Sequence, residues 1–76
     1  MANNANIVDA LDAEAAITDI QSILLNRGMS TTDLAVELGW KRKQVEEFLY
    51  GVDIPSLKQF NEVANILDYE LDFTQQ

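Results

Sequence analysis

The chain has 76 residues, 47% of them hydrophobic, and its formal net charge is −8. This length predicts at most one domain with one small core, and the hydrophobic fraction predicts a folded globule rather than a disordered tail. The sequence contains no cysteine and no histidine, so it lacks a disulfide framework, the commonest general base and the strongest nucleophile. We therefore expect neither an enzyme nor a bound metal or cofactor.

The start of the chain, MANNANIVDALDAEAA, has no basic region and no long apolar run, so we expect no signal peptide. No apolar run approaches membrane-spanning length, and we expect a cytoplasmic protein without a membrane contact. The acidity opposes nonspecific binding to nucleic acid. A local basic patch can still act inside an acidic protein, because salt confines surface fields to about 8–10 Å.

The first predicted helical segment runs from Ile7 to Gly28, which ends it, with Arg27 placed where a cation suits the helix dipole. Asp12 offers a second N-cap inside the segment, so the pattern allows one helix or two. Spacings of three and four indicate a helix for the apolar residues Ile7, Val8, Leu11, Ala15, Ala16, Ile17, Ile20, Ile23 and Leu24.

Two short helices, each followed by a glycine, are predicted next. The first begins at one of the capping residues at positions 30–33 and stops at Gly39, and the second ends at Gly51. Their apolar positions are Leu34, Ala35, Leu38, Val45, Phe48 and Leu49.

The last predicted helix follows the connector VDIPS, with Ser56 as its N-cap. Its apolar face consists of Leu57, Phe60, Val63, Ala64 and Leu67. The closing segment YELDF, residues 69–73, alternates apolar and acidic residues, which favours a strand but is too short to exclude a helix. It either packs on its own domain or pairs with a second copy. Its alternating acids do not form a calcium loop, since the required glycine and final glutamate are missing.

The sequence thus predicts an all-α fold, a compact bundle of four to five short helices. We expect an N-terminal extension over residues 1–12, partly frayed or helical, a domain over residues 13–73 and a tail over residues 74–76. The extension packs on the domain, covers a dimer seam or binds a partner.

Residues 31–50 form a unit in which two helices meet through a tight turn. Such a crossing needs a small residue at the contact and a glycine where the first helix ends, and Ala35 and Gly39 supply them. Apolar residues suited to the inner faces are Leu34, Leu38, Trp40, Val45 and Phe48. Trp40 is expected to pack in or beside the core, and the alternative is an exposed anchor for another protein.

On these residues the chain resembles the XRE-type helix-turn-helix domains, the family of the lambda repressor and Cro. The resemblance covers residues 13–73 and is carried by MSTTDLAVELGW, Gly51, IPSLKQFNEVANIL and DYELDF. It implies a compact helical domain, often a dimer, that reads double-stranded operator DNA through the second helix of the unit.

Carried over by position, the recognition helix covers residues 42–50. The implied DNA-binding residues are Thr31, Thr32, Lys41, Arg42, Lys43, Gln44, Glu46 and Glu47. The two threonines fall where members of the family touch phosphate, and a helix N-terminus suits that role.

The chain departs from the family pattern at four positions. Lys41 stands where a capping Ser or Thr is usual, and a lysine cannot cap. Trp40 replaces a small aliphatic residue, Leu49 stands where many members have Glu, and Asp68 stands where a helix-ending Gly is common. A lysine retained at a capping position suggests another task, such as meeting a phosphate.

The basic triplet at positions 41–43 has a local interpretation as well. Arg42 can pair with Glu46, and Lys43 with Glu47, each four residues along the helix. Such pairs contribute only about 0.2–0.5 kcal/mol, so they do not exclude DNA contact.

Two functions follow from the sequence. The leading hypothesis is a small sequence-specific DNA-binding transcriptional regulator of bacterial or phage type, acting as a homodimer, with Arg42 and Lys43 as main contacts. The rival is a helix-turn-helix fold that binds protein, as an antirepressor, an antitoxin-like module or an acidic inhibitor of a DNA-binding partner. The net charge of −8 and Glu46 and Glu47 favour the rival, and the basic triplet favours the leader.

Overall fold

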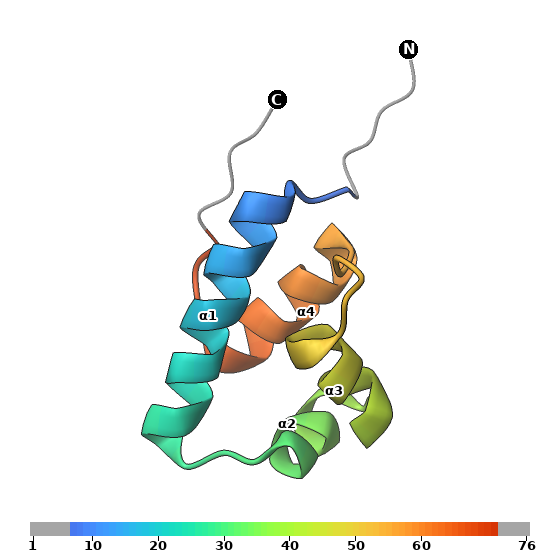
Figure 1. Cartoon of the computed structure of the whole chain (residues 1–76). Helices are drawn as coiled ribbons and strands as arrows, with labels where there is room; N and C mark the ends of the chain where they lie inside the picture. The colour runs from blue at the N-terminus through green and yellow to red at the C-terminus, as the bar shows by residue number, and fades with distance from the viewer. Residues whose placement is uncertain (1–6, 72–76) are drawn as a thin grey trace.

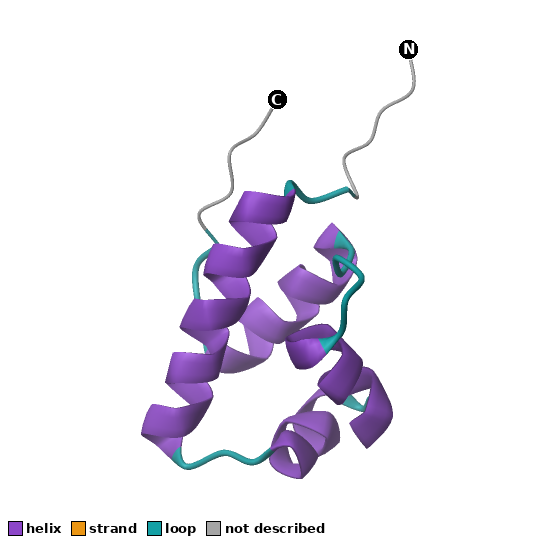
Figure 2. Cartoon of the chain, viewed as in Figure 1, coloured by secondary structure: helices purple, strands orange, loops and turns teal. Residues whose placement is uncertain are grey.

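The computed structural model describes residues 7–71, which contain four helices and no strand (Figures 1 and 2). The helices are α1 (Ala10–Arg27), α2 (Thr31–Leu38), α3 (Arg42–Tyr50) and α4 (Leu57–Leu67). The expected all-α bundle is confirmed. Residues 1–6 of the predicted extension, the predicted tail at 74–76 and the last two residues of YELDF lie outside the described residues.

α1 is one helix, so the alternative of two helices separated at Asp12 is wrong. Asp9 is the N-cap, and its carboxylate accepts a hydrogen bond from the backbone N–H of Leu11 at 2.9 Å. Val8 before the cap and Ala13 in the first turn are both buried, which fixes where the chain enters the helix. α1 thus begins inside the predicted extension of residues 1–12, and the division into extension, domain and tail stays a prediction.

Three of the helices end in a left-handed residue. Gly28 and Gly39 have φ of 66° and 74°, as their positions after the apolar patterns predict. Asp68, which ends α4, has φ of 56° although it carries a side chain. Aspartate tolerates this region better than most residues, so the departure from glycine noted in the sequence costs some stability without breaking the helix end.

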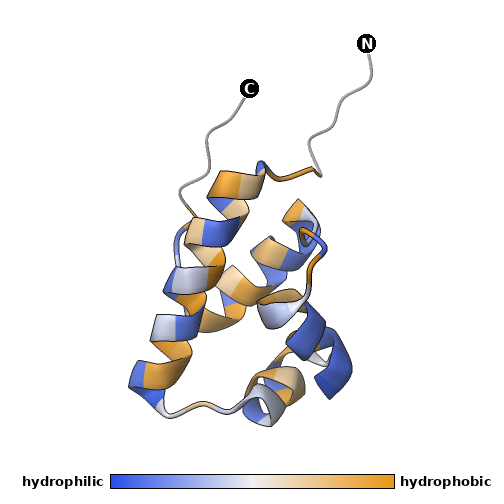
Figure 3. Cartoon of the chain, viewed as in Figure 1, coloured by the Kyte–Doolittle hydropathy of each residue, from blue (hydrophilic) through white to orange (hydrophobic). Residues whose placement is uncertain are grey.

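The core lies where the four helices meet. α2 packs on α3 and on α4, and the ring of Phe48 lies edge-on to that of Phe60 with 5.0 Å between their centroids. The most completely buried side chains of the core are Ile20, Leu34, Val45, Phe60, Val63 and Leu67. Figure 3 shows the most hydrophilic stretch of the bundle at the start of α3.

Side-chain hydrogen bonds join α1 to the other elements. Gln21 Nε2 donates to the carbonyl of Leu49 at 3.0 Å, and Arg27 Nη2 donates to that of Leu67 at 2.7 Å. The hydroxyl of Tyr69 donates to Asp19 Oδ2 at 2.8 Å. These contacts connect α1 to the last residues of α3 and α4 and to the closing segment.

The described part of the closing segment packs on its own domain. Tyr69 and Leu71 are partly buried against the core, and residues 69–71 form neither a strand nor a helix. Pairing of the segment with a second copy stays a hypothesis. Three residues of the apolar pattern, Ile7 before α1 and Leu11 and Ala15 within it, are exposed. The face that α1 buries contains Ala13, Ala16, Ile20 and Leu24.

Candidate nucleic-acid interface

The junction between α2 and α3 is built around Trp40. Gly39 in its left-handed conformation lets the N–H of Trp40 bond back to the carbonyl of Ala35 at 3.0 Å, which closes the end of α2. The indole ring is partly buried, lies edge-on to Phe48 at 5.8 Å, and donates its N–H to Glu62 Oε1 at 3.0 Å. Trp40 therefore ties the start of α3 to α4, as the packing interpretation expects.

α3 has two dissimilar sides. Val45, Phe48 and Leu49 are buried and hold the helix against the core. The other residues of α3 are exposed. Besides Tyr50 at its end they are Arg42, Lys43, Gln44, Glu46 and Glu47, and we call these five the α3 outer face. All five α3 residues of the implied DNA-binding set therefore share one solvent-facing surface.

The N-terminus of α3 has only one of the two hydrogen bonds that make up a capping box. Lys41 is the N-cap residue, and its side chain, which has no acceptor, makes no cap hydrogen bond. Gln44 makes the other hydrogen bond of a capping box, because its Oε1 accepts from the backbone N–H of Lys41 at 2.9 Å. The Gln44 carbonyl is thus occupied in holding the helix start, and its amide nitrogen is left to donate elsewhere.

Of the two ion pairs suggested by the sequence, one is formed in the described residues and the other is not. Arg42 Nε contacts Glu46 Oε2 at 3.1 Å, with exposed side-chain fractions of 68% and 47%. An exposed pair of this kind contributes little stability and is easily exchanged for another partner. No ion pair joins Lys43 to Glu47 among the described residues, so that half of the local interpretation is wrong.

Thr31 and Thr32 are the first two residues of α2, with Thr31 partly buried and Thr32 exposed. Ser30 is the N-cap, and its hydroxyl accepts from the N–H of Asp33 at 3.0 Å while Asp33 Oδ2 accepts from the N–H of Ser30 at 3.0 Å. This complete capping box places a carboxylate at the same helix end as the threonines. The charge of Asp33 opposes a phosphate at that position.

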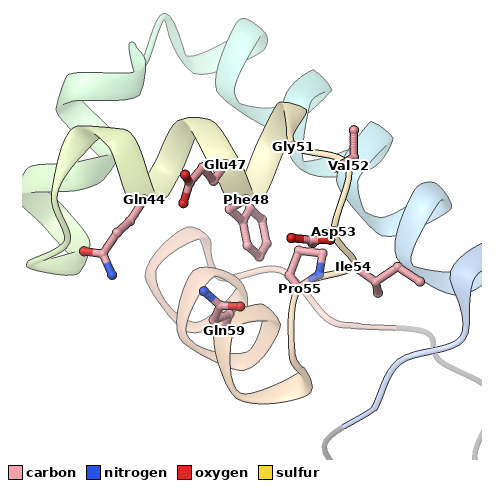
Figure 4. A pocket seen from close by; sticks show the side chains of 9 residues that line it. All are labelled: Gln44, Glu47, Phe48, Gly51, Val52, Asp53, Ile54, Pro55 and Gln59. Atoms are coloured by element: carbon pink, nitrogen blue, oxygen red, sulfur yellow. The ribbon is translucent and has the colours of Figure 1, made fainter.

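A cleft between α3 and α4 adds a residue that the sequence reading missed. Gln44 and Glu47 of α3 line one side of the cleft, and Gln59 of α4 lies on the other (Figure 4). Gln59 repeats the role of Gln44, because its Oε1 accepts from the N–H of the N-cap Ser56 at 3.0 Å. The signal was available in the sequence, since SLKQ has the spacing of a capping box.

Residues 7–71 contain no group of three or more acidic side chains arranged to hold a metal ion. In the same range no helix combines the length and the apolar character that crossing a membrane requires. Comparison of the chain with protein-family models, with curated proteins and with solved structures gives no significant match. The geometry of the α3 outer face and the junction at Trp40 are therefore the basis for an assignment.

Proposed function

We propose that this protein is a small sequence-specific DNA-binding transcriptional regulator of bacterial or phage type. It acts in the cytoplasm as a homodimer and presents the α3 outer face to the major groove. The observation that supports this most is the concentration of charge: three of the five basic residues, Lys41, Arg42 and Lys43, stand together at the exposed start of α3. The resemblance to the XRE-type helix-turn-helix family supports the same assignment by analogy.

Arg42 is the residue we assign to base reading. Its guanidinium can grip the O6 and N7 atoms of a guanine in a bidentate way, which a lysine cannot do. Leaving Glu46 costs about 0.3–0.5 kcal/mol, far less than a good bidentate base contact contributes, at about 1–3 kcal/mol. The exposed pair with Glu46 therefore does not prevent DNA contact.

Lys41 and Lys43 are assigned to phosphates. Lysine acts there as a point charge and needs no fixed geometry. Gln44 holds the start of the helix through Lys41, so we assign it a positioning role rather than a bidentate contact with adenine, which would require its occupied carbonyl. Thr31 and Thr32 supply weaker contacts, because the carboxylate of Asp33 stands at the same helix end.

The test is selection of a binding site from random double-stranded DNA at low salt, followed by Arg42→Ala and Arg42→Lys. The alanine variant should lose several-fold or more in affinity, and the lysine variant should keep overall affinity better than it keeps discrimination of guanine. Val36→Ala, an exposed change on α2, is the neutral control. Absence of DNA binding at low salt would overturn the proposal.

The second candidate function is binding of a protein through the same surface. Glu46 and Glu47 are exposed on the α3 outer face, and the chain carries a charge of −8, so the face also fits a basic protein surface. This function predicts a stoichiometric protein partner in a pull-down from the native host.

One double substitution should change affinity in opposite directions under the two functions. Glu46→Lys with Glu47→Lys should strengthen binding to DNA, because two repulsions from phosphate become attractions. The same change should weaken a complex with a basic protein surface. Affinity for the selected DNA site and recovery of the partner are therefore measured on the same variant.

A further inference from the structure

A second groove runs between α1 and the chain that leads from α3 to α4, and it shares residues 51–55 with the cleft that Gln44 and Glu47 line. One wall is α1 from Ala10 to Gln21, and the other is the segment at residues 49–55. We call this the α1 groove. Neither Arg42 nor Lys43 lines it, so DNA contact by the α3 outer face does not account for it.

The wall at residues 49–55 displays apolar side chains to solvent. Val52 is 99% exposed, Tyr50 is 68% exposed and Ile54 is 50% exposed. In Figure 4 the side chain of Ile54 points away from Phe48, on the side where α1 lies. Single exposed apolar residues are ordinary, but three within five positions along one groove mark an interaction surface.

The groove has a fixed shape because both walls are tied to the bundle. Gln21 Nε2 bonds to the carbonyl of Leu49, which joins the two walls directly. Gly51 lies so close to the backbone of Glu47 that any side chain would collide with it, and Pro55 is buried. A preformed groove loses less entropy on binding than one that must order.

The charges around the groove all have one sign. Glu14 and Asp53 line it, and Asp9 and Asp12 stand at the same end of α1, whereas none of the five basic residues lines it. A second copy placed in the groove would bring a chain of charge −8 against these carboxylates. A cationic partner has the complementary charge.

We infer that the α1 groove binds an amphipathic helix of another protein, one with an apolar stripe flanked by lysine or arginine. The wall formed by α1 runs twelve residues from Ala10 to Gln21, which is about 18 Å of helix. That length accommodates about three turns of a partner helix, with apolar anchors at i, i+3, i+4 and i+7. The apolar anchors contact Tyr50, Val52 and Ile54, and the cations face Glu14 and Asp53.

The test uses a synthetic peptide with leucine at those four spacings and lysine at the other exposed positions. A scrambled peptide of the same composition and a peptide with glutamate in place of lysine are the controls. Calorimetry should show saturable binding of the first peptide alone. The largest changes in backbone amide resonances of the protein should fall at residues 49–55 and along the first half of α1.

Two variants of the intact chain remove the apolar and the charged half of the site separately. One double variant combines Val52→Ser with Ile54→Ser, and the other combines Glu14→Lys with Asp53→Lys. Each double variant should weaken peptide binding at least tenfold. Val36→Ser and Glu37→Lys, exposed changes on α2, are the matched controls and should bind as the parent protein does. Circular dichroism and thermal melting establish that each variant is folded.

Three outcomes would overturn the inference. One is equal binding of the scrambled peptide, which would reduce the effect to general attraction to an acidic protein. Another is resonance changes centred on the α3 outer face. The third is a dimer in sedimentation that the Val52 and Ile54 changes dissociate, which would make a second copy the occupant of the groove.

Discussion

The two sides of α3 differ in what they tolerate. On the inner side, Val45, Phe48 and Leu49 are buried among side chains from other helices, so their shapes must fit. On the outer side, Arg42 and Glu46 form an exposed pair that holds nothing else in place. The comparison teaches that one short helix makes its stabilising contacts on one side only, so the residues of the α3 outer face can be altered with little effect on stability.

The largest effect is expected on the inner side, from Phe48→Ala. The ring of Phe48 packs edge-on against both Trp40 and Phe60, and its removal leaves a cavity between helices. We expect a loss of about 3–5 kcal/mol in the free energy of unfolding, which is a large part of the total for a chain of this size. Urea titration followed by circular dichroism measures it.

Arg42→Ala is the matched change on the outer side of the same helix. It should alter the free energy of unfolding by no more than about 0.5 kcal/mol, because the side chain is exposed and its ion pair is weak. A loss comparable to that of Phe48→Ala would show that the two sides are not separable.

An effect smaller than that of Phe48→Ala is expected where α3 ends, and it is best compared with the effect at the end of α2. In Gly51→Ala the new Cβ meets the backbone carbonyl of Glu47, and the expected loss is about 1–3 kcal/mol. In Gly39→Ala the Cβ meets nothing within 4 Å, and the loss of about 1–2 kcal/mol comes from the positive φ alone.

Asparagine distinguishes the two causes. Gly39→Asn should recover much of the stability that alanine loses, since asparagine tolerates the left-handed region. Gly51→Asn should recover none, because the collision with the Glu47 carbonyl involves any Cβ. Thermal melting of the four variants gives the ranking, and equal recovery at both positions would refute this explanation.

A gain in stability, rather than a loss, is expected from Lys41→Ser. Serine can accept a hydrogen bond at the N-cap that lysine leaves unmade, and the change removes a cation from the positive end of the helix. The free energy of unfolding should rise by about 1 kcal/mol, while affinity for the selected DNA falls if Lys41 meets a phosphate. Lys43→Ser removes the same charge without adding a cap, so a similar gain from it would contradict the capping explanation.

The sequence predicted the helix ends well because the residues that form them act locally. Gly28 and Gly39 end helices, and Ser30 and Ser56 cap them, each through groups within a few positions along the chain. Asp9 was missed as a cap because Asp12 offers the same chemistry three residues later. Burial of Val8, which the pattern alone does not reveal, decides between them.

Contacts between distant parts of the chain could not be predicted in the same way. The residues of the α3 outer face follow from helical spacing, and they are exposed as expected. The bond from Trp40 to Glu62 spans 22 positions, and that from Gln21 to Leu49 spans 28. Such pairs depend on how helices pack, so neither the anchoring of α3 nor the α1 groove was visible in the pattern.

Trp40 also gives the unmodified protein an optical probe. It is the one tryptophan in the chain, so the intrinsic fluorescence excited at the indole band comes from a single place. That place is in contact with Phe48 of α3 and hydrogen-bonded to Glu62 of α4. A change in emission on adding DNA therefore reports a change in the surroundings of the indole at the junction of α2, α3 and α4, without any label attached to the chain.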